Sequence, residues 1–254
     1  MRKPRAPKRV IAGTYPINTG TAAILPDPLR DGAFTLEVNR VPSSYVVLDA
    51  PEVLHFDYMR WVAGFVAKQA QPFTAVHLGA AGCALPSYFA HRWDSSNTAV
   101  EIDAGLAKLV RWAFDPPVAI RVAEARAFTH AIPAGSVDVI VRDVFAGPAV
   151  PRPLTTVEFF RAVRAALAPG GVYAANVGDR AGLAQTRQEL AGLSEVFSHL
   201  AVAGPSAMLD GREYGNLVIA ASDRPLSFDG EVPCRDASYL LDGSARPRRD
   251  HDHG

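Results

Sequence analysis

The feature that most constrains this chain is a regular alternation of short apolar runs and amphipathic stretches between residues 73 and 222. The apolar runs, which we interpret as strands, cover 75–78, 98–102, 119–122, 137–141 and 172–176. The stretches with helical spacing cover 85–92, 104–114, 156–167 and 180–195. Strands that alternate with helices in this way form right-handed βαβ units. The sequence therefore predicts an α/β fold with a doubly wound, mostly parallel sheet. Two last runs, 199–202 and 216–221, are expected to close it as an antiparallel pair.

The segments that flank this alternation follow other patterns. Residues 10–50 contain short apolar runs interrupted by glycine and proline, among them 34–39 and 45–48, which predict a small N-terminal antiparallel sheet. From Glu52 the apolar residues recur at helical spacing. We therefore divide the chain into a mobile basic arm (1–9), a small N-terminal β-sheet (10–50), an α/β domain (51–232) and a polar C-terminal tail (233–254). The tail is expected to be disordered from Arg246.

Charge and cysteine content exclude several classes of function. The formal net charge is +0, so bulk electrostatics favour neither nucleic acid nor a membrane surface as a partner. The two cysteines, Cys83 and Cys234, are too few for a disulfide framework and lack the spacing of metal ligands. We expect a cytoplasmic protein without a metal, whose partner is a small molecule.

Two strand ends in the first half of the α/β domain carry candidate ligand-binding residues. The first strand runs into a turn with Gly79 and Gly82, where small residues let a ligand approach the backbone and the next helix N-terminus favours a polar group. Glycine in such a turn can also be required only because a larger side chain would clash, without any ligand. The second strand ends at Glu101 and Asp103. Asp103 suits a helix N-cap, whereas Glu101 lies inside an apolar run and is the better candidate for binding ribose hydroxyls.

Two further strand ends place acids on the same edge. Glu124, followed by Ala125, comes after the third strand, where it could accept a hydrogen bond from an adenine amino group or form a solvated pair with Arg126. Asp143 follows the fourth strand, just before a Gly-Pro break. Open α/β sheets bind their ligands at the carboxyl ends of the strands. The four positions together therefore predict a nucleoside site at this edge.

In their order along the chain, these motifs resemble those of the spermidine synthase (aminopropyltransferase) family, a branch of the class I S-adenosylmethionine-dependent methyltransferase fold. The similarity covers about residues 45–222. It rests on the segments 46–49, 78–79, 100–103, 137–143, 147–148, 155–159 and 167–172. The small sheet before the nucleoside-binding domain also fits the family.

The resemblance implies a role for each matching residue. The glycine turn, with Gly79 and Gly82, would hold the nucleoside sulfonium of S-adenosylmethionine or its decarboxylated form. Glu101 would bind ribose, Glu124 with Ala125 would bind adenine, and Asp143 would be the general base that deprotonates the attacking amine. The family's second acid, which grips the polyamine, falls on Ala146. The turn at 79–84 also lacks the family's carboxylate. The helix that supplies a tyrosine and a glutamate in the family corresponds to 52–58, and the resemblance leaves the roles of these residues open.

Three functions remain open on this basis. The first is an aminopropyltransferase-like enzyme of polyamine biosynthesis. The second is a methyltransferase that acts on a less charged small molecule, which the missing carboxylates favour. The third is a non-catalytic nucleoside-binding protein. We expect a homo-oligomer, a dimer, in each case. A dinucleotide-dependent dehydrogenase is disfavoured because the turn lacks a G-x-G-x-x-G pattern.

Overall fold

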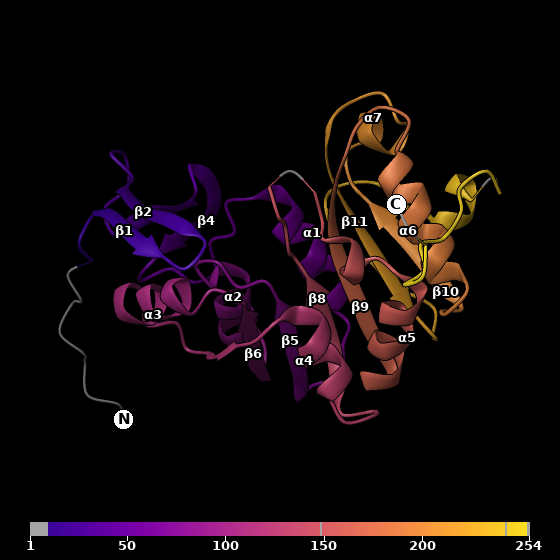
Figure 1. Ribbon diagram of the computed structural model, residues 1–254, viewed down its shortest axis with the longest axis horizontal. Coiled ribbons are helices and arrows are strands. Elements are labelled where there is room, and N and C mark those ends of the chain that lie inside the picture. Colours follow the sequence, from indigo (N-terminus) through magenta and orange to yellow (C-terminus); the bar gives the residue numbers. More distant parts are fainter. Residues whose placement is uncertain (1–9, 148, 242, 253–254) are drawn as a thin grey trace.

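The computed structural model describes residues 10–147, 149–241 and 243–252, and it contains a small and a large β-sheet (Figure 1). The predicted basic arm, 1–9, lies outside the described residues. The small sheet is antiparallel and has the order β1-β2-β3-β4. Its strands are β1 (Gly13–Ile17), β2 (Gly20–Pro26), β3 (Ala33–Val38) and β4 (Val41–Val47). The predicted N-terminal sheet is confirmed, although its first hairpin was missed.

The large sheet has the order β12-β10-β11-β9-β8-β5-β6-β7. Strands β5 to β9 run parallel to their neighbours among themselves, and β10, β11 and β12 join antiparallel at one side. The strands are β5 (Phe73–Leu78), β6 (Ser95–Glu101), β7 (Ala119–Val122), β8 (Val137–Arg142), β9 (Leu167–Asp179), β10 (His199–Ala203), β11 (Gly215–Ser222) and β12 (Cys234–Asp236). The doubly wound, mostly parallel fold is confirmed.

Helices cover both faces of the large sheet. The helices are α1 (Asp57–Val66), α2 (Ala84–Arg92), α3 (Ala104–Ala113), α4 (Ala125–Ala131), α5 (Val157–Ala166), α6 (Ala184–Ser194) and the short α7 (Ser206–Leu209). Alternate strand residues face opposite helix layers: Leu78 and Ile140 pack with α4, α5 and α6, whereas Ala75 and Val139 pack with α1 and α2. Among the described residues, no helix combines the length and apolar content that a bilayer crossing requires.

Asp103 joins the small sheet to the α/β domain. It is the N-cap of α3, as the sequence predicts, and accepts a hydrogen bond from Leu106 N at 2.8 Å. The same carboxylate accepts from Asn18 N at 3.1 Å and from Thr19 N and Thr19 Oγ1 at 2.7 Å each, in the turn between β1 and β2. One buried side chain therefore holds the hairpin against the helix.

Two predicted helices begin later than their periodicity indicates. The helix expected from Glu52 begins at Asp57, because Phe56 is extended (φ −81°, ψ 126°) and His55 stacks on Tyr45 of the small sheet at 4.3 Å between ring centroids. Residues 52–56 thus link the two sheets. The helix expected from Arg180 begins at Ala184, after Leu183 in the left-handed region.

The described residues of the C-terminal segment 233–254 make contacts with the rest of the fold, and these contacts include residues 248–252 of the stretch expected to be disordered from Arg246. Strand β12 pairs with β10 at the edge of the large sheet, and the 3-10 turn η2 (Ala237–Leu240) buries Ala237 and Leu240 in the core. Residues 248–252 pack against the N-terminus of α5. The polar composition of the tail gives no indication of these contacts, because their partners are distant in the sequence.

Candidate active site

The structure places the four predicted positions at the carboxyl ends of adjacent parallel strands. Gly79 follows β5, Glu101 ends β6, Glu124 comes after β7, and Asp143 follows β8. These strands lie in the order β8-β5-β6-β7, so the four residues line a single edge. This arrangement confirms the predicted placement; the binding and catalytic roles remain predictions.

The glycine turn brings two strand ends together. Gly79 has a φ of +83°, and a Cβ there would lie 2.2 Å from the carbonyl oxygen of Asp143. Only glycine fits this close approach between β5 and β8. Gly82 serves a different contact: it is buried, its N–H donates to Ser44 Oγ at 2.9 Å, and a Cβ would lie 2.7 Å from Ser44 Cβ. Its amide is therefore already engaged with the small sheet, and Gly79 is the better-placed glycine for a ligand.

The Glu101 carboxylate is held at the turn by backbone amides. Asp103 N donates to its Oε1 at 2.9 Å, and the amides of Ala80 and Ala81 also donate to the carboxylate. Burial raises the pKa of Glu101, and these hydrogen bonds oppose the rise. A carboxylate offers about four lone-pair sites, so roughly one remains for a ligand hydroxyl. The next residue, Ile102, is 63% exposed at the same edge.

Glu124 caps α4. Its Oε1 accepts from Arg126 N at 2.8 Å and its Oε2 from Ala127 N at 2.7 Å, while Ala125 is buried at the start of the helix. The Arg126 side chain pairs instead with Asp250, so the alternative of a Glu124–Arg126 side-chain pair is wrong. The second lone pair of each Glu124 oxygen is the part that could still face an adenine amino group.

Asp143 has both carboxylate oxygens hydrogen-bonded. Tyr58 Oη on α1 donates to Oδ2 at 2.7 Å, and Asn176 Nδ2 on β9 donates to Oδ1 at 2.9 Å. Burial raises the pKa of Asp143, while these two bonds and the charge of Arg142 oppose the rise. Burial and the nearby Asp143 charge hold the pKa of Tyr58 well above its usual value, so its hydroxyl remains a donor at neutral pH.

Sequence reasoning left the role of Tyr58 open and did not identify the two asparagines that orient Asp143. Asn216 Nδ2 on β11 donates to Asn176 Oδ1 at 2.8 Å, which turns the Asn176 amide nitrogen toward Asp143. Asn176 interrupts the apolar run of β9, the same signal that singled out Glu101 on β6. Tyr58 ends the segment 52–58, which the resemblance relates to the family's tyrosine-bearing helix, and the fold brings its hydroxyl to Asp143.

A buried ion pair supports the strand end that carries Asp143. Arg142 Nη1 lies 2.9 Å from Glu189 Oε2 of α6, and both side chains are at most 1% exposed. Arg142 also donates to the carbonyl oxygens of Leu154 at 3.1 Å and Asn176 at 3.3 Å. It thereby ties β8 to β9 and to the far end of the loop that follows Asp143.

Of two surface cavities, one lies beside the turn that follows β9 and the other lies at the start of β9. One of about 280 Å³ is lined by Arg187, Asp210 and Tyr239, and the other, of about 480 Å³, by Arg161, Phe197 and Arg224. Neither is lined by the strand-end acids. The partly buried Asp143 carboxylate and its two side-chain donors are therefore a better candidate for the reacting group than either cavity.

Comparison with known proteins identifies the family. No family model and no curated protein matches the sequence. A solved structure described as a probable spermidine synthase from Corynebacterium glutamicum matches with a TM-score of 0.87 and 38% identity, over 96% of this chain and 98% of that chain. The chain belongs to the spermidine synthase-like family.

More distant spermidine synthase and methyltransferase structures share the fold. A spermidine synthase in complex with the transition-state analogue AdoDATO matches at 19% identity and a TM-score of 0.59, over 85% of this chain and 73% of that chain. Human methyltransferase-like protein 13, in complex with SAH, matches at 21% identity and a TM-score of 0.55, over 66% and 83%. Likeness at these identities shows the fold alone.

Proposed function

We propose that this protein is a transferase that binds S-adenosylmethionine or its decarboxylated form at the β5–β8 edge and moves the aminopropyl group to an amine. The observation that carries the proposal is Asp143, a partly exposed carboxylate with both oxygens oriented by Tyr58 and Asn176. It lies beside Gly79, whose turn would receive the sulfonium end of the nucleoside.

In the proposed reaction, Asp143 accepts a proton from the acceptor amine. The amine nitrogen forms a bond to the aminopropyl carbon beside the sulfonium, the C–S bond breaks, and its electrons neutralise the sulfur. The products are an alkylated amine and the thioether methylthioadenosine. The donor of an aminopropyl group is the decarboxylated form, because S-adenosylmethionine itself would donate a chain that still carries a carboxylate. Because burial raises the pKa of Asp143, the group is a stronger base than a solvated carboxylate. Orientation of the amine supplies much of the rate, since the sulfonium is already activated.

The acceptor we propose is a monoamine or a less charged molecule than putrescine. Ala146, exposed on the loop after Asp143, cannot pair with a distal ammonium. A hydrogen bond to a charged group contributes about 1.5–3 kcal/mol, so its absence would weaken the binding of a diamine by about one to two orders of magnitude. We expect turnover of a monoamine to exceed that of putrescine, and Ala146→Asp to improve putrescine use.

Methyl transfer is the second candidate. It is favoured by the lack of a carboxylate in the 79–84 turn, where an aminopropyl ammonium would require one. Calorimetric titration with S-adenosylmethionine, its decarboxylated form and methylthioadenosine separates the two candidates. A strong preference for the decarboxylated ligand supports aminopropyl transfer, and a preference for S-adenosylmethionine supports the methyltransferase. Efficient putrescine turnover by the unmodified protein would contradict the proposed acceptor.

A further inference from the structure

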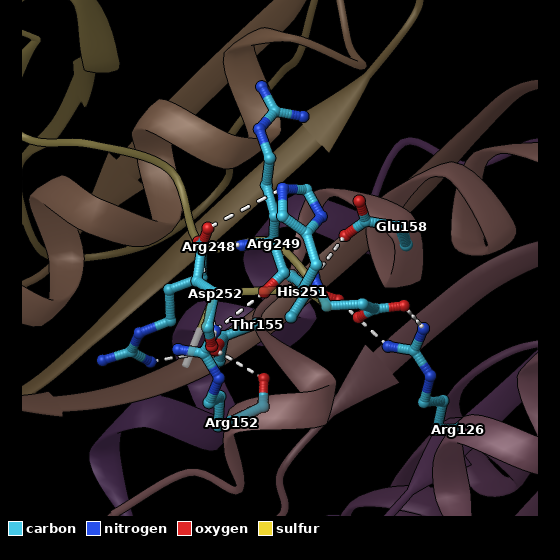
Figure 2. Close-up of polar contacts among 10 residues, drawn as sticks. Arg126, Arg152, Thr155, Glu158, Arg248, Arg249, His251 and Asp252 are labelled. Carbon is cyan, nitrogen blue, oxygen red and sulfur yellow. Dashed lines mark hydrogen bonds and ion pairs between the residues drawn. The ribbon is translucent and has the colours of Figure 1, made fainter. Parts of the chain in front are cut away.

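Residues 248–252, the C-terminal strap, lie across the N-terminal ends of α4 and α5 (Figure 2). Thr156 and Arg248 form a parallel β-bridge, and Val157 N donates to the Arg248 carbonyl oxygen at 3.0 Å. The first amides of a helix lack intrahelical partners, so this bond satisfies one of them at α5. Arg248 Nη1 also donates to Thr155 Oγ1 at 2.9 Å.

Asp250 connects the strap to the helix that starts at the predicted adenine contacts. Its Oδ2 lies 2.5 Å from Arg126 Nη2, and its own N–H donates to Glu158 Oε2 at 3.1 Å. Arg126 is the second residue of α4, directly after Ala125. Its Nη1 donates to the Pro153 carbonyl oxygen at 2.6 Å and to Thr156 Oγ1 at 3.0 Å. Asp250 thus fixes the arginine that joins α4 to the end of the loop after Asp143.

Two more arginines bind the strap to neighbouring elements. Arg152, in the 3-10 turn η1 (Arg152–Leu154), donates to the carbonyl oxygens of Arg249 at 2.8 Å and of Asp252. The Arg249 guanidinium pairs with Glu195, just after α6, at 2.6 Å. The strap therefore contacts α4, η1, α5 and the end of α6. Arg142, which is not part of the strap, donates to the carbonyl oxygen of Leu154 at the end of the loop that follows Asp143.

We propose that the C-terminal strap is a positioning element for the nucleoside site, which orders the first turn of α4 and the end of the Asp143 loop before a ligand binds. The inference rests on the proposed function for its ligand. Its physical basis is that α4 has 7 residues, too short to be stable alone, and starts at Glu124 and Ala125. A site whose backbone is already ordered does not lose that conformational freedom when a ligand binds, so ligand binding costs less entropy.

The test is substitution of Asp250 in the full-length protein, with a matched control at the opposite edge of the sheet. Asp250→Ala removes the partner of Arg126, and Asp250→Glu keeps the charge as a rescue. Asp223→Ala removes a comparable exposed ion pair, with Arg164 at 2.8 Å. Affinity for methylthioadenosine is measured by calorimetry. Hydrogen exchange is measured without ligand over residues 124–131 and 152–158.

We expect Asp250→Ala to weaken methylthioadenosine binding about two- to fivefold, since exposed ion pairs contribute modestly. Exchange should accelerate over both segments, while Asp250→Glu restores both readouts and Asp223→Ala changes neither. If Asp250 only stabilised the fold as a whole, Asp250→Ala would lower the unfolding midpoint without faster hydrogen exchange at 124–131. That result would overturn the inference. Unchanged affinity in Asp250→Ala also overturns it. If the parent protein binds neither S-adenosylmethionine, nor its decarboxylated form, nor methylthioadenosine, the proposed function is refuted. The positioning role is then refuted with it, whatever the hydrogen exchange shows.

Discussion

Glu101 and Asp143 show how carboxylates are held at the ends of apolar strands. Each lies where burial raises its pKa, and each is surrounded by donors that oppose the rise: backbone amides around Glu101, and Tyr58 and Asn176 at Asp143. Groups desolvated in this way and paired with specific partners are typical of functional sites. Both residues interrupt or end a hydrophobic pattern without being required by the core.

Replacing Glu101 by alanine should weaken nucleoside binding. A charge-assisted hydrogen bond to ribose contributes about 1.5–3 kcal/mol, which is the loss we expect in the binding free energy of methylthioadenosine. Calorimetry measures it, with Asp223→Ala as the control because Asp223 lies at the opposite edge of the sheet. Equal affinity in the Glu101 variant and the parent would remove Glu101 from the site.

Replacing Tyr58 by phenylalanine should move the acid limb of the pH–rate profile to higher pH. The Tyr58 hydroxyl stabilises the charged form of Asp143, so its removal raises the pKa of the base. The profile of kcat/KM against pH, taken with the best amine acceptor, measures the shift. Tyr88→Phe on α2 is the matched control, since Tyr88 packs against Phe89 and Trp93 instead. Identical acid limbs in the two variants would contradict the role.

At the scale of secondary structure, the Arg142–Glu189 pair links β8 to α6. The pair is fully desolvated, and Arg142 also bonds backbone oxygens of the η1 turn and of β9. Buried ion pairs add little net stability over apolar residues, but removing one partner leaves an uncompensated charge. The pair therefore fixes where β8 ends, and with it the position of Asp143.

Glu189→Leu should destabilise the protein strongly. The unpaired Arg142 charge would lower the free energy of unfolding by about 3–5 kcal/mol. The double variant Arg142→Met/Glu189→Leu should lose less than the sum of the two single variants, because no buried charge remains. Urea denaturation of all four proteins measures the cycle. Additive losses would mean that the two charges are not coupled.

At the scale of the whole molecule, the small sheet and the α/β domain form a continuous structure (Figure 1). The α3 helix shares a core cluster with β2 and β3, Ser44 bonds the glycine turn, and Asp103 holds the first hairpin. The small sheet thereby contacts the same turn that would receive the nucleoside.

Asp103→Ala should loosen this junction in a pH-dependent way. We expect a loss of about 2–4 kcal/mol at pH 7, because a helix cap and further hydrogen bonds to a carboxylate disappear. Burial would raise the pKa of Asp103, but hydrogen bonds from Leu106, Thr19 and Asn18 outweigh it and lower the pKa below 3.8. The stabilisation is therefore complete above about pH 4 and is lost as the pH falls through the folded-state pKa. Urea denaturation of the parent and the variant at pH 7 and at a pH below the folded-state pKa of Asp103 tests this. A difference in the free energy of unfolding that is as large at the lower pH would contradict it.

The sequence alone determined the mostly parallel character of the sheet and the edge where Gly79, Glu101, Glu124 and Asp143 lie. Hydrophobic periodicity and strand-end residues are local signals, and the βαβ rule converts them into topology. Only the tertiary structure brought Tyr58 to Asp143 across 85 positions and Asp250 to Arg126 across 124. Such contacts leave no periodic trace, because a polar side chain facing solvent and one facing a distant partner follow the same local pattern.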